Sequence, residues 1–165
     1  MKKLIYTCIA LVFVITLANI DTLAQKQTDT GVEIEKDLAL LRKDLRSEKK
    51  KIIAMNVAFT ADEATKFWPV YDEYAAAMSK HYDAFYGIIK EYAANQKTLT
   101  DAQAIDMLKR WSTIQVELAQ TRQKYIPMVE KVVSGRKAAH FFQIDRRLYG
   151  LMDLQIASEV PLVLQ

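Results

Sequence analysis

The side chains best able to bind a metal or carry a proton are two histidines, and neither has the partners that such chemistry needs. A di-iron helical bundle places a glutamate three residues before each histidine, and no acidic residue stands three or four positions before His81 or His140. Met78 lies one helical turn before His81, so a soft metal site built from these three residues stays an alternative. We favour a histidine partly packed at the edge of a helix seam for both positions, and we expect no metal ligand and no cofactor.

Other catalytic groups are also missing from the sequence. It contains no glycine-rich phosphate loop, no serine nucleophile elbow and no pair of carboxylates on an apolar helix face. Its single cysteine, Cys8, lies in an apolar run close to the start of the chain. We therefore expect a protein that is not an enzyme.

The start of the chain has the three-part layout of a secretory signal peptide. Two lysines precede an apolar run over residues 4–18, and Ala24 is suited to be the last residue before cleavage. The run is shorter than the roughly 20 residues that a membrane-spanning helix needs. We expect residues 1–24 to be a cleaved signal peptide, residues 25–32 to be a flexible N-terminus, and the product to be periplasmic without a membrane span.

Composition limits both the fold and the partners. The formal net charge is only +3 in 165 residues, which gives no electrostatic footprint for nucleic acid. Four glycines and three prolines are too few for the many turns of a β or α/β domain. We predict an all-α fold in which residues 33–165 form a single domain.

Apolar side chains recur every three or four residues along two long stretches, as on one face of an α-helix. Over residues 61–94 the repeating positions are Phe67, Tyr71, Tyr74, Met78, Tyr82, Phe85, Ile89 and Tyr92. Over residues 101–133 they are Met107, Trp111, Ile114, Leu118, Thr121, Tyr125, Met128 and Val132. Because only a short polar stretch joins them, the sequence predicts a long antiparallel helical hairpin.

Each hairpin helix has a start signal. Thr60 with Glu63, and Thr100 with Gln103, have the spacing of a capping box, in which both side chains satisfy backbone N–H groups of the first turn. We expect the two helices to begin directly after these threonines.

A hairpin that turns near residues 96 and 97 also predicts which side chains face each other. The expected pairs are Tyr82 with Trp111, Phe85 with Met107 or Leu108, Met78 with Ile114, and Trp68 with Tyr125. The same register brings Pro69 and Pro127 to nearly the same height. Since each proline removes one backbone hydrogen bond, we expect both helices to bend there.

Shorter helices are predicted on both sides of the hairpin, over residues 33–55 and 136–159. Gly135 would end the preceding helix, since glycine commonly follows a helix C-terminus. Three consecutive lysines, Lys49–Lys51, could contact an anionic membrane or a client protein, but we favour a solvated helix face. The apolar tail over residues 160–164 either docks on the body or meets another chain.

Most of the aromatic residues fall on the predicted core stripes. Tyr86 and Tyr92 fit a single core stripe less well than the others, and tyrosines on a surface would suit loose binding of varied partners. We therefore expect these two side chains to contribute to a binding surface.

Four short motifs carry a resemblance to a known family. Leu99–Gln103 spells Leu-Thr-x-x-Gln, and Phe59–Glu63 is a looser copy. With the export signal and the helical pattern, the chain resembles the Spy/CpxP family of periplasmic LTxxQ proteins. The runs Phe67–Tyr71 and Lys137–Gln143 are similar to those of uncharacterised exported relatives of that family.

The resemblance implies a bent, cradle-like helical hairpin, usually dimeric, that acts as an ATP-independent chaperone or as an adaptor in envelope-stress signalling. Some members of the family bind metal. The expected partners are therefore unfolded or envelope proteins, with a homodimer as a further possibility. The residues that define the motif and the hairpin are Thr60, Glu63, Trp68, Pro69, Thr100, Gln103, Trp111 and Pro127. Two alternatives remain open: a periplasmic metal-binding sensor or buffer, and a structural helical oligomer that binds no client.

Overall fold

The computed structural model describes residues 48–160 and 162–163. The expected signal peptide (1–24), the flexible N-terminus (25–32) and most of the first predicted helix lie outside the described residues. Within the described part every regular element is helical, which confirms the predicted all-α fold. These elements are a helical segment over residues 48–56, α2 (Ala61–Asn95), α3 (Asp101–Glu130) and α4 (Gly135–Glu159).

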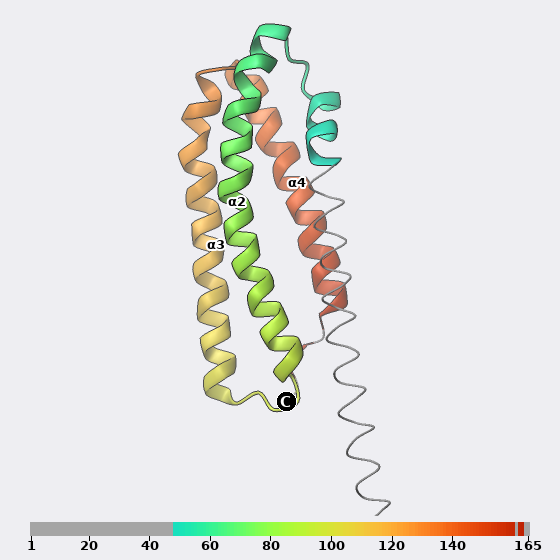
Figure 1. The fold of residues 1–165 in the computed structure, drawn as a ribbon, viewed down its shortest axis with the longest axis vertical. Coiled ribbons are helices and arrows are strands. Elements are labelled where there is room, and N and C mark those ends of the chain that lie inside the picture. The colour runs from blue at the N-terminus through green and yellow to red at the C-terminus, as the bar shows by residue number, and fades with distance from the viewer. Residues whose placement is uncertain (1–47, 161, 164–165) are drawn as a thin grey trace, which may run out of the picture.

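Helices α2 and α3 form the predicted antiparallel hairpin and pack against each other along their length (Figure 1). Helix α4 returns along the other side of α2, and the segment 48–56 lies beside the first half of α4 (Figure 1). No helix among the described residues combines the length and the hydropathy needed to span a bilayer.

Both hairpin helices begin at a capping box. The Thr60 hydroxyl accepts from the Glu63 backbone N–H at 3.2 Å, and the Glu63 carboxylate accepts from the Thr60 N–H at 2.8 Å. The Thr100 and Gln103 side chains make the equivalent pair of bonds at 3.3 and 2.9 Å. A cap of this kind stabilises a helix by about 1 kcal/mol.

The junction between α3 and α4 differs from the prediction. Helix α3 ends at Glu130, before the expected 133, and Gly135 is the first residue of α4 rather than the end of α3. The Ser134 hydroxyl accepts from the Lys137 N–H and so caps α4. Because the chain turns without any glycine at positive φ, Gly135 is not needed as a helix stop.

Pro69 and Pro127 both lie inside helices that continue through them. Each helix begins well before its proline, so only one backbone hydrogen bond is lost within an otherwise complete ladder. The expected bend at this height stays a prediction.

The buried face of α2 is wider than a single seam. Tyr86 and Tyr92, which were expected on a binding surface, are only 2% and 8% exposed, so that prediction was wrong. The burial of Tyr92 agrees instead with its place on the predicted stripe. Phe85, which was assigned to the stripe, is only partly buried. The physical reason is that α2 has a neighbour on two sides, so positions turned toward α4 are covered as well as those turned toward α3.

Candidate binding surfaces

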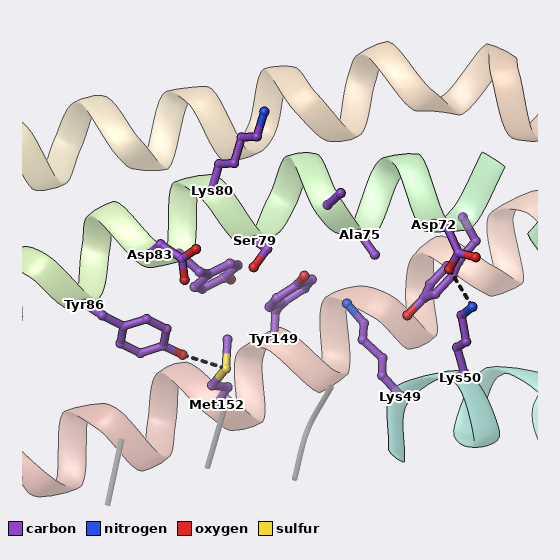
Figure 2. Close-up of a pocket in the computed structure, with 13 residues that line it drawn as sticks. Lys49, Lys50, Asp72, Ala75, Ser79, Lys80, Asp83, Tyr86, Tyr149 and Met152 are labelled. Atoms are coloured by element: carbon purple, nitrogen blue, oxygen red, sulfur yellow. Dashed lines mark hydrogen bonds and ion pairs between the residues drawn. The ribbon is translucent and has the colours of Figure 1, made fainter. Parts of the chain in front are cut away.

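A groove with a volume of about 490 Å³ runs between α2 and α4 and meets the segment 48–56 at one end (Figure 2). Tyrosines from both long helices, a methionine and small side chains of α2 line most of it, and two lysines enter from the segment 48–56. Among the lining residues are Lys49, Ser79, Tyr82, Tyr86, Tyr149 and Met152. The groove is therefore aromatic along its length, with Lys49, Lys50 and Asp72 at one end and two further charged side chains, Lys80 and Asp83 of α2, beyond them.

Two stacked tyrosines bridge the helices in this groove. The rings of Tyr82 and Tyr149 are nearly parallel, at an interplanar angle of 4°, with centroids 4.4 Å apart. One turn further along α2, the Tyr86 hydroxyl donates to Met152 Sδ at 3.0 Å (Figure 2). Tyr82 was expected to face Trp111 of α3; it instead stacks on α4, and Trp111 is 41% exposed, so that pairing was wrong.

A buried ion pair closes the charged end of the groove. Lys49 Nζ lies 2.6 Å from Asp145 Oδ1, and the two residues are only 5% and 0% exposed. The Tyr74 hydroxyl donates to the other Asp145 oxygen at 2.6 Å. Lys49 Nζ also lies 3.5 Å from the centre of the Tyr149 ring, a cation–π geometry. This network ties the segment 48–56 to both α4 and α2.

The electrostatics of this cluster follow from its burial. Loss of solvent lowers the pKa of Lys49 from its ordinary value, and the charge of Asp145 opposes that shift. Burial, reinforced by the Asp145 carboxylate, raises the pKa of Tyr74, which keeps its hydroxyl protonated as a donor.

The prediction of a solvated face for the three lysines was wrong for one of them. Lys50 pairs with Asp72, and Lys51 with Glu48, at exposed positions. Lys49 points inward because it is one turn from Ile53, which is fully buried. Its partner could not be predicted from local spacing, since Asp145 lies on the last helix.

The two histidines occupy different environments. The ring nitrogens of His81 lie 3.1 Å from Glu117 Oε2 and 2.9 Å from Thr121 Oγ1, so it sits at the edge of the α2–α3 seam as expected. His140 was expected to be partly packed but is exposed, because Phe141 takes the inward position beside it. Met78 is fully buried in the core. No group of three or more His, Cys, Asp or Glu residues in the described ranges is arranged to hold a metal ion.

Helix α3 carries a second apolar surface that faces away from its core side. Its first four members are spaced three to five residues apart, the fifth follows ten residues later, and all are 41–55% exposed. They are Ile105, Leu108, Trp111, Val116 and Ile126, and we call them the α3 strip. At about 100° per residue, Ile105, Leu108, Val116 and Ile126 lie about 100° or more from the mean direction of the buried Met107, Ile114 and Leu118. Trp111 lies only about 40° from that direction, at the edge of the core side, which agrees with its partial exposure.

The other motif residues have structural roles. Trp68 packs against Phe59, Phe67 and Tyr71. Tyr74, which lies between one and two turns further along α2, is the residue that meets Tyr125, so the predicted pairing of Trp68 with Tyr125 was wrong. Besides capping α2, Glu63 accepts from Lys137 Nζ and so joins the first turn of α2 to that of α4. Nothing in the local sequence around Glu63 marks that second role.

Comparison with known proteins found no matching family model, no similar curated protein and no similar solved structure.

Proposed function

We propose that the chain is an exported, non-enzymatic binding protein that holds apolar segments of unfolded or envelope proteins without ATP. This is the role of a Spy/CpxP-type chaperone or stress adaptor, and the resemblance of the sequence to that family supports it. The observation that carries the proposal is the α3 strip, a row of exposed apolar side chains on a helix whose other face already supplies the core.

The dimensions of the strip suit an extended polypeptide. From Ile105 to Ile126 it runs roughly 30 Å at the helical rise of about 1.5 Å per residue. An extended chain covers that distance with about nine residues. Trp111 offers a large apolar ring with a polar N–H, which favours contact with many different side chains.

Polar side chains interrupt the strip. Ser112, Gln115 and Gln123 are exposed between its apolar members, and Lys109 and Lys124 lie close by. A surface divided in this way gives several small apolar contacts and not one continuous hydrophobic interface. It therefore suits weak, reversible capture of clients better than a permanent subunit contact.

The test is suppression of client aggregation without ATP. The purified protein should slow aggregation of a chemically unfolded client at near-stoichiometric ratio, and a Trp111→Ser/Val116→Ser variant should lose most of that effect. The matched control is Leu154→Ser, which removes an exposed leucine of α4 outside the strip and should keep full suppression.

Three results would contradict the proposal. The first is no suppression by the unmodified protein over a range of clients. The second is an equal loss in the strip variant and in the α4 control. The third is a stable dimer in light scattering at every dilution, if only the strip variant dissociates it. The α3 strip would then be the contact between two copies of the chain.

A further inference from the structure

The described chain begins at the mouth of the α2–α4 groove. Lys49 reaches into the groove and lies over Tyr149, while Lys50 is paired with Asp72 on the α2 side (Figure 2). The upstream chain is therefore joined to the described fold at this end of the groove.

The segment 48–56 already shows which of its faces is turned inward. Lys49 and Ile53 are 5% and 0% exposed, whereas Lys51 is exposed and Met55 is 84% exposed. A helix repeats its face every three to four residues, so the inward face can be followed upstream by its sequence positions.

Four apolar residues occupy those upstream positions. Counting back at 100° per residue, Ile34, Leu38, Leu41 and Leu45 fall on the same side as Lys49, while Lys43 falls on the opposite side. These residues lie outside the described part of the chain, and only their spacing in the sequence is used. An apolar stripe thus continues the buried face of the segment 48–56.

Chain direction relates the upstream sequence positions to positions along the groove. The connection 57–60 between the segment 48–56 and α2 is too short for anything but an antiparallel pair. Moving upstream from Lys50, which pairs with Asp72, therefore means moving along α2 toward Ser79, Tyr82 and Tyr86. On α4 the same direction leads from Asp145 to Tyr149 and Met152.

We propose that residues 34–45 of the same chain dock in the α2–α4 groove, with Leu38, Leu41 and Leu45 against the tyrosines and Met152 that line it. The docked segment completes an antiparallel four-helix arrangement, and the Lys49–Asp145 ion pair fixes its register at one end. This inference concerns a different face from the α3 strip and does not depend on the proposed function.

Disulfide trapping tests the docking directly. In a Cys8→Ser background, the whole chain carries Ser79→Cys together with either Leu41→Cys or Lys43→Cys. Ser79 points into the groove (Figure 2), and both upstream positions lie near its height. Because a disulfide needs Cα atoms within about 7 Å, mild oxidation should close an intrachain bond for Leu41→Cys and leave the Lys43→Cys control reduced.

Equal cross-linking of both variants, or of neither, would overturn the proposal. An interchain disulfide would overturn it as well, because it would show that the upstream segment of a second copy binds in the groove. Near-UV circular dichroism supplies a second readout without cysteines. Leu41→Asp should weaken the signal of the stacked Tyr82 and Tyr149 rings while far-UV helicity is kept, and Lys43→Asp should not; an unchanged signal in Leu41→Asp would count against docking.

Discussion

Helix α2 packs against α3 on one side and against α4 on the other, and the two contacts differ in their side chains, although Tyr74 takes part in both. Toward α3 the backbones approach closely, the core side of α3 supplies Met107, Ile114 and Leu118, and polar contacts such as Glu91 with Arg110 lie at the rim. Toward α4 the contact is made of large rings and of the buried hydrogen bond from the Tyr74 hydroxyl to Asp145. Fewer rings lie between α2 and α3, where Tyr74 meets Tyr125, and these two helices approach closely. The several ring pairs between α2 and α4 hold those helices farther apart and leave a groove beside them.

The two contacts also differ in how strictly they fix the position of one helix along another. An aliphatic stripe meets a second stripe equally well after a shift of two turns, because the pattern repeats every seven residues. A buried charge has one acceptable partner, since any other position leaves it unpaired. We infer that the Lys49–Asp145–Tyr74 cluster sets the register of the α4 side, and four substitutions test this contrast.

Breaking the buried ion pair should have the largest effect. Asp145→Ala leaves Lys49 and the Tyr74 hydroxyl without their acceptor, so we expect the free energy of unfolding to fall by about 3–5 kcal/mol. The exposed pair of Lys66 and Asp62 provides the control, and Asp62→Ala should cost no more than about 1 kcal/mol. Urea denaturation measures both, and similar losses in the two variants would remove the proposed role of the cluster.

Removing the ring that joins the helices should have the next largest effect. Tyr149→Leu loses the stack on Tyr82 and the cation–π contact with Lys49, and should lower the free energy of unfolding by about 2–3 kcal/mol. Tyr149→Phe keeps the ring and should lose less than about 1 kcal/mol. If the phenylalanine variant were as unstable as the leucine variant, the hydroxyl and not the ring would be responsible.

A smaller effect is expected at the rim of the α2–α3 seam. His81→Ala removes the contacts with Glu117 and Thr121, and because both are partly exposed we expect a loss of about 0.5–1.5 kcal/mol in thermal or urea unfolding. Thr113→Ala is the control, since its hydroxyl bonds only the Lys109 carbonyl of its own helix. A loss as large as that of Asp145→Ala would mean that the two sides of α2 do not differ as described.

The smallest effect should be a pH dependence at the start of α2. The hydrogen bond from Lys137, followed by that from the Thr60 backbone, lowers the pKa of Glu63 below its ordinary value of 4.5. A carboxyl whose folded-state pKa is lowered stabilises the fold above its unfolded pKa, and this stabilisation is lost as pH falls through the folded value.

Glu63→Gln isolates that charge, because glutamine at this position can still complete the capping box. Wild type should therefore be more stable than Glu63→Gln at pH 7, and the difference should disappear as the pH is lowered well below 4.5. Thermal unfolding across pH 3–7 measures it, with Lys137→Met as the matched variant. A difference that is constant with pH would show that the charge is not involved.

Local signals predicted most of the secondary structure. The capping boxes at Thr60 and Thr100 satisfy backbone groups within four residues of themselves, so their effect can be identified without any knowledge of the fold. The periodicity of the apolar stripes likewise predicted the last residue of α2 to within one position, although it predicted that α3 would continue past Glu130.

The predicted register failed for a related reason. A stripe gives the face of a helix but not its position along the neighbour, and in the structure Tyr125 meets Tyr74, whereas the prediction set it level with Trp68. The observed position of α3 along α2 therefore differs from the predicted one by between one and two helical turns. The α3 strip was missed because Trp111 was assigned to the seam, although Leu108, Val116 and Ile126 already marked a second apolar face.

The sequence by itself determined where the helices of this protein begin, that they are amphipathic, and that two of them form a hairpin, because each of these properties depends on residues a few positions apart. The tertiary structure alone decided that Lys49 is buried against Asp145, that Tyr82 stacks on Tyr149, and that Trp111 is left outside. The physical reason is that these outcomes depend on how far each helix slides and turns against its neighbours, which is settled by the fit of all the side chains between them.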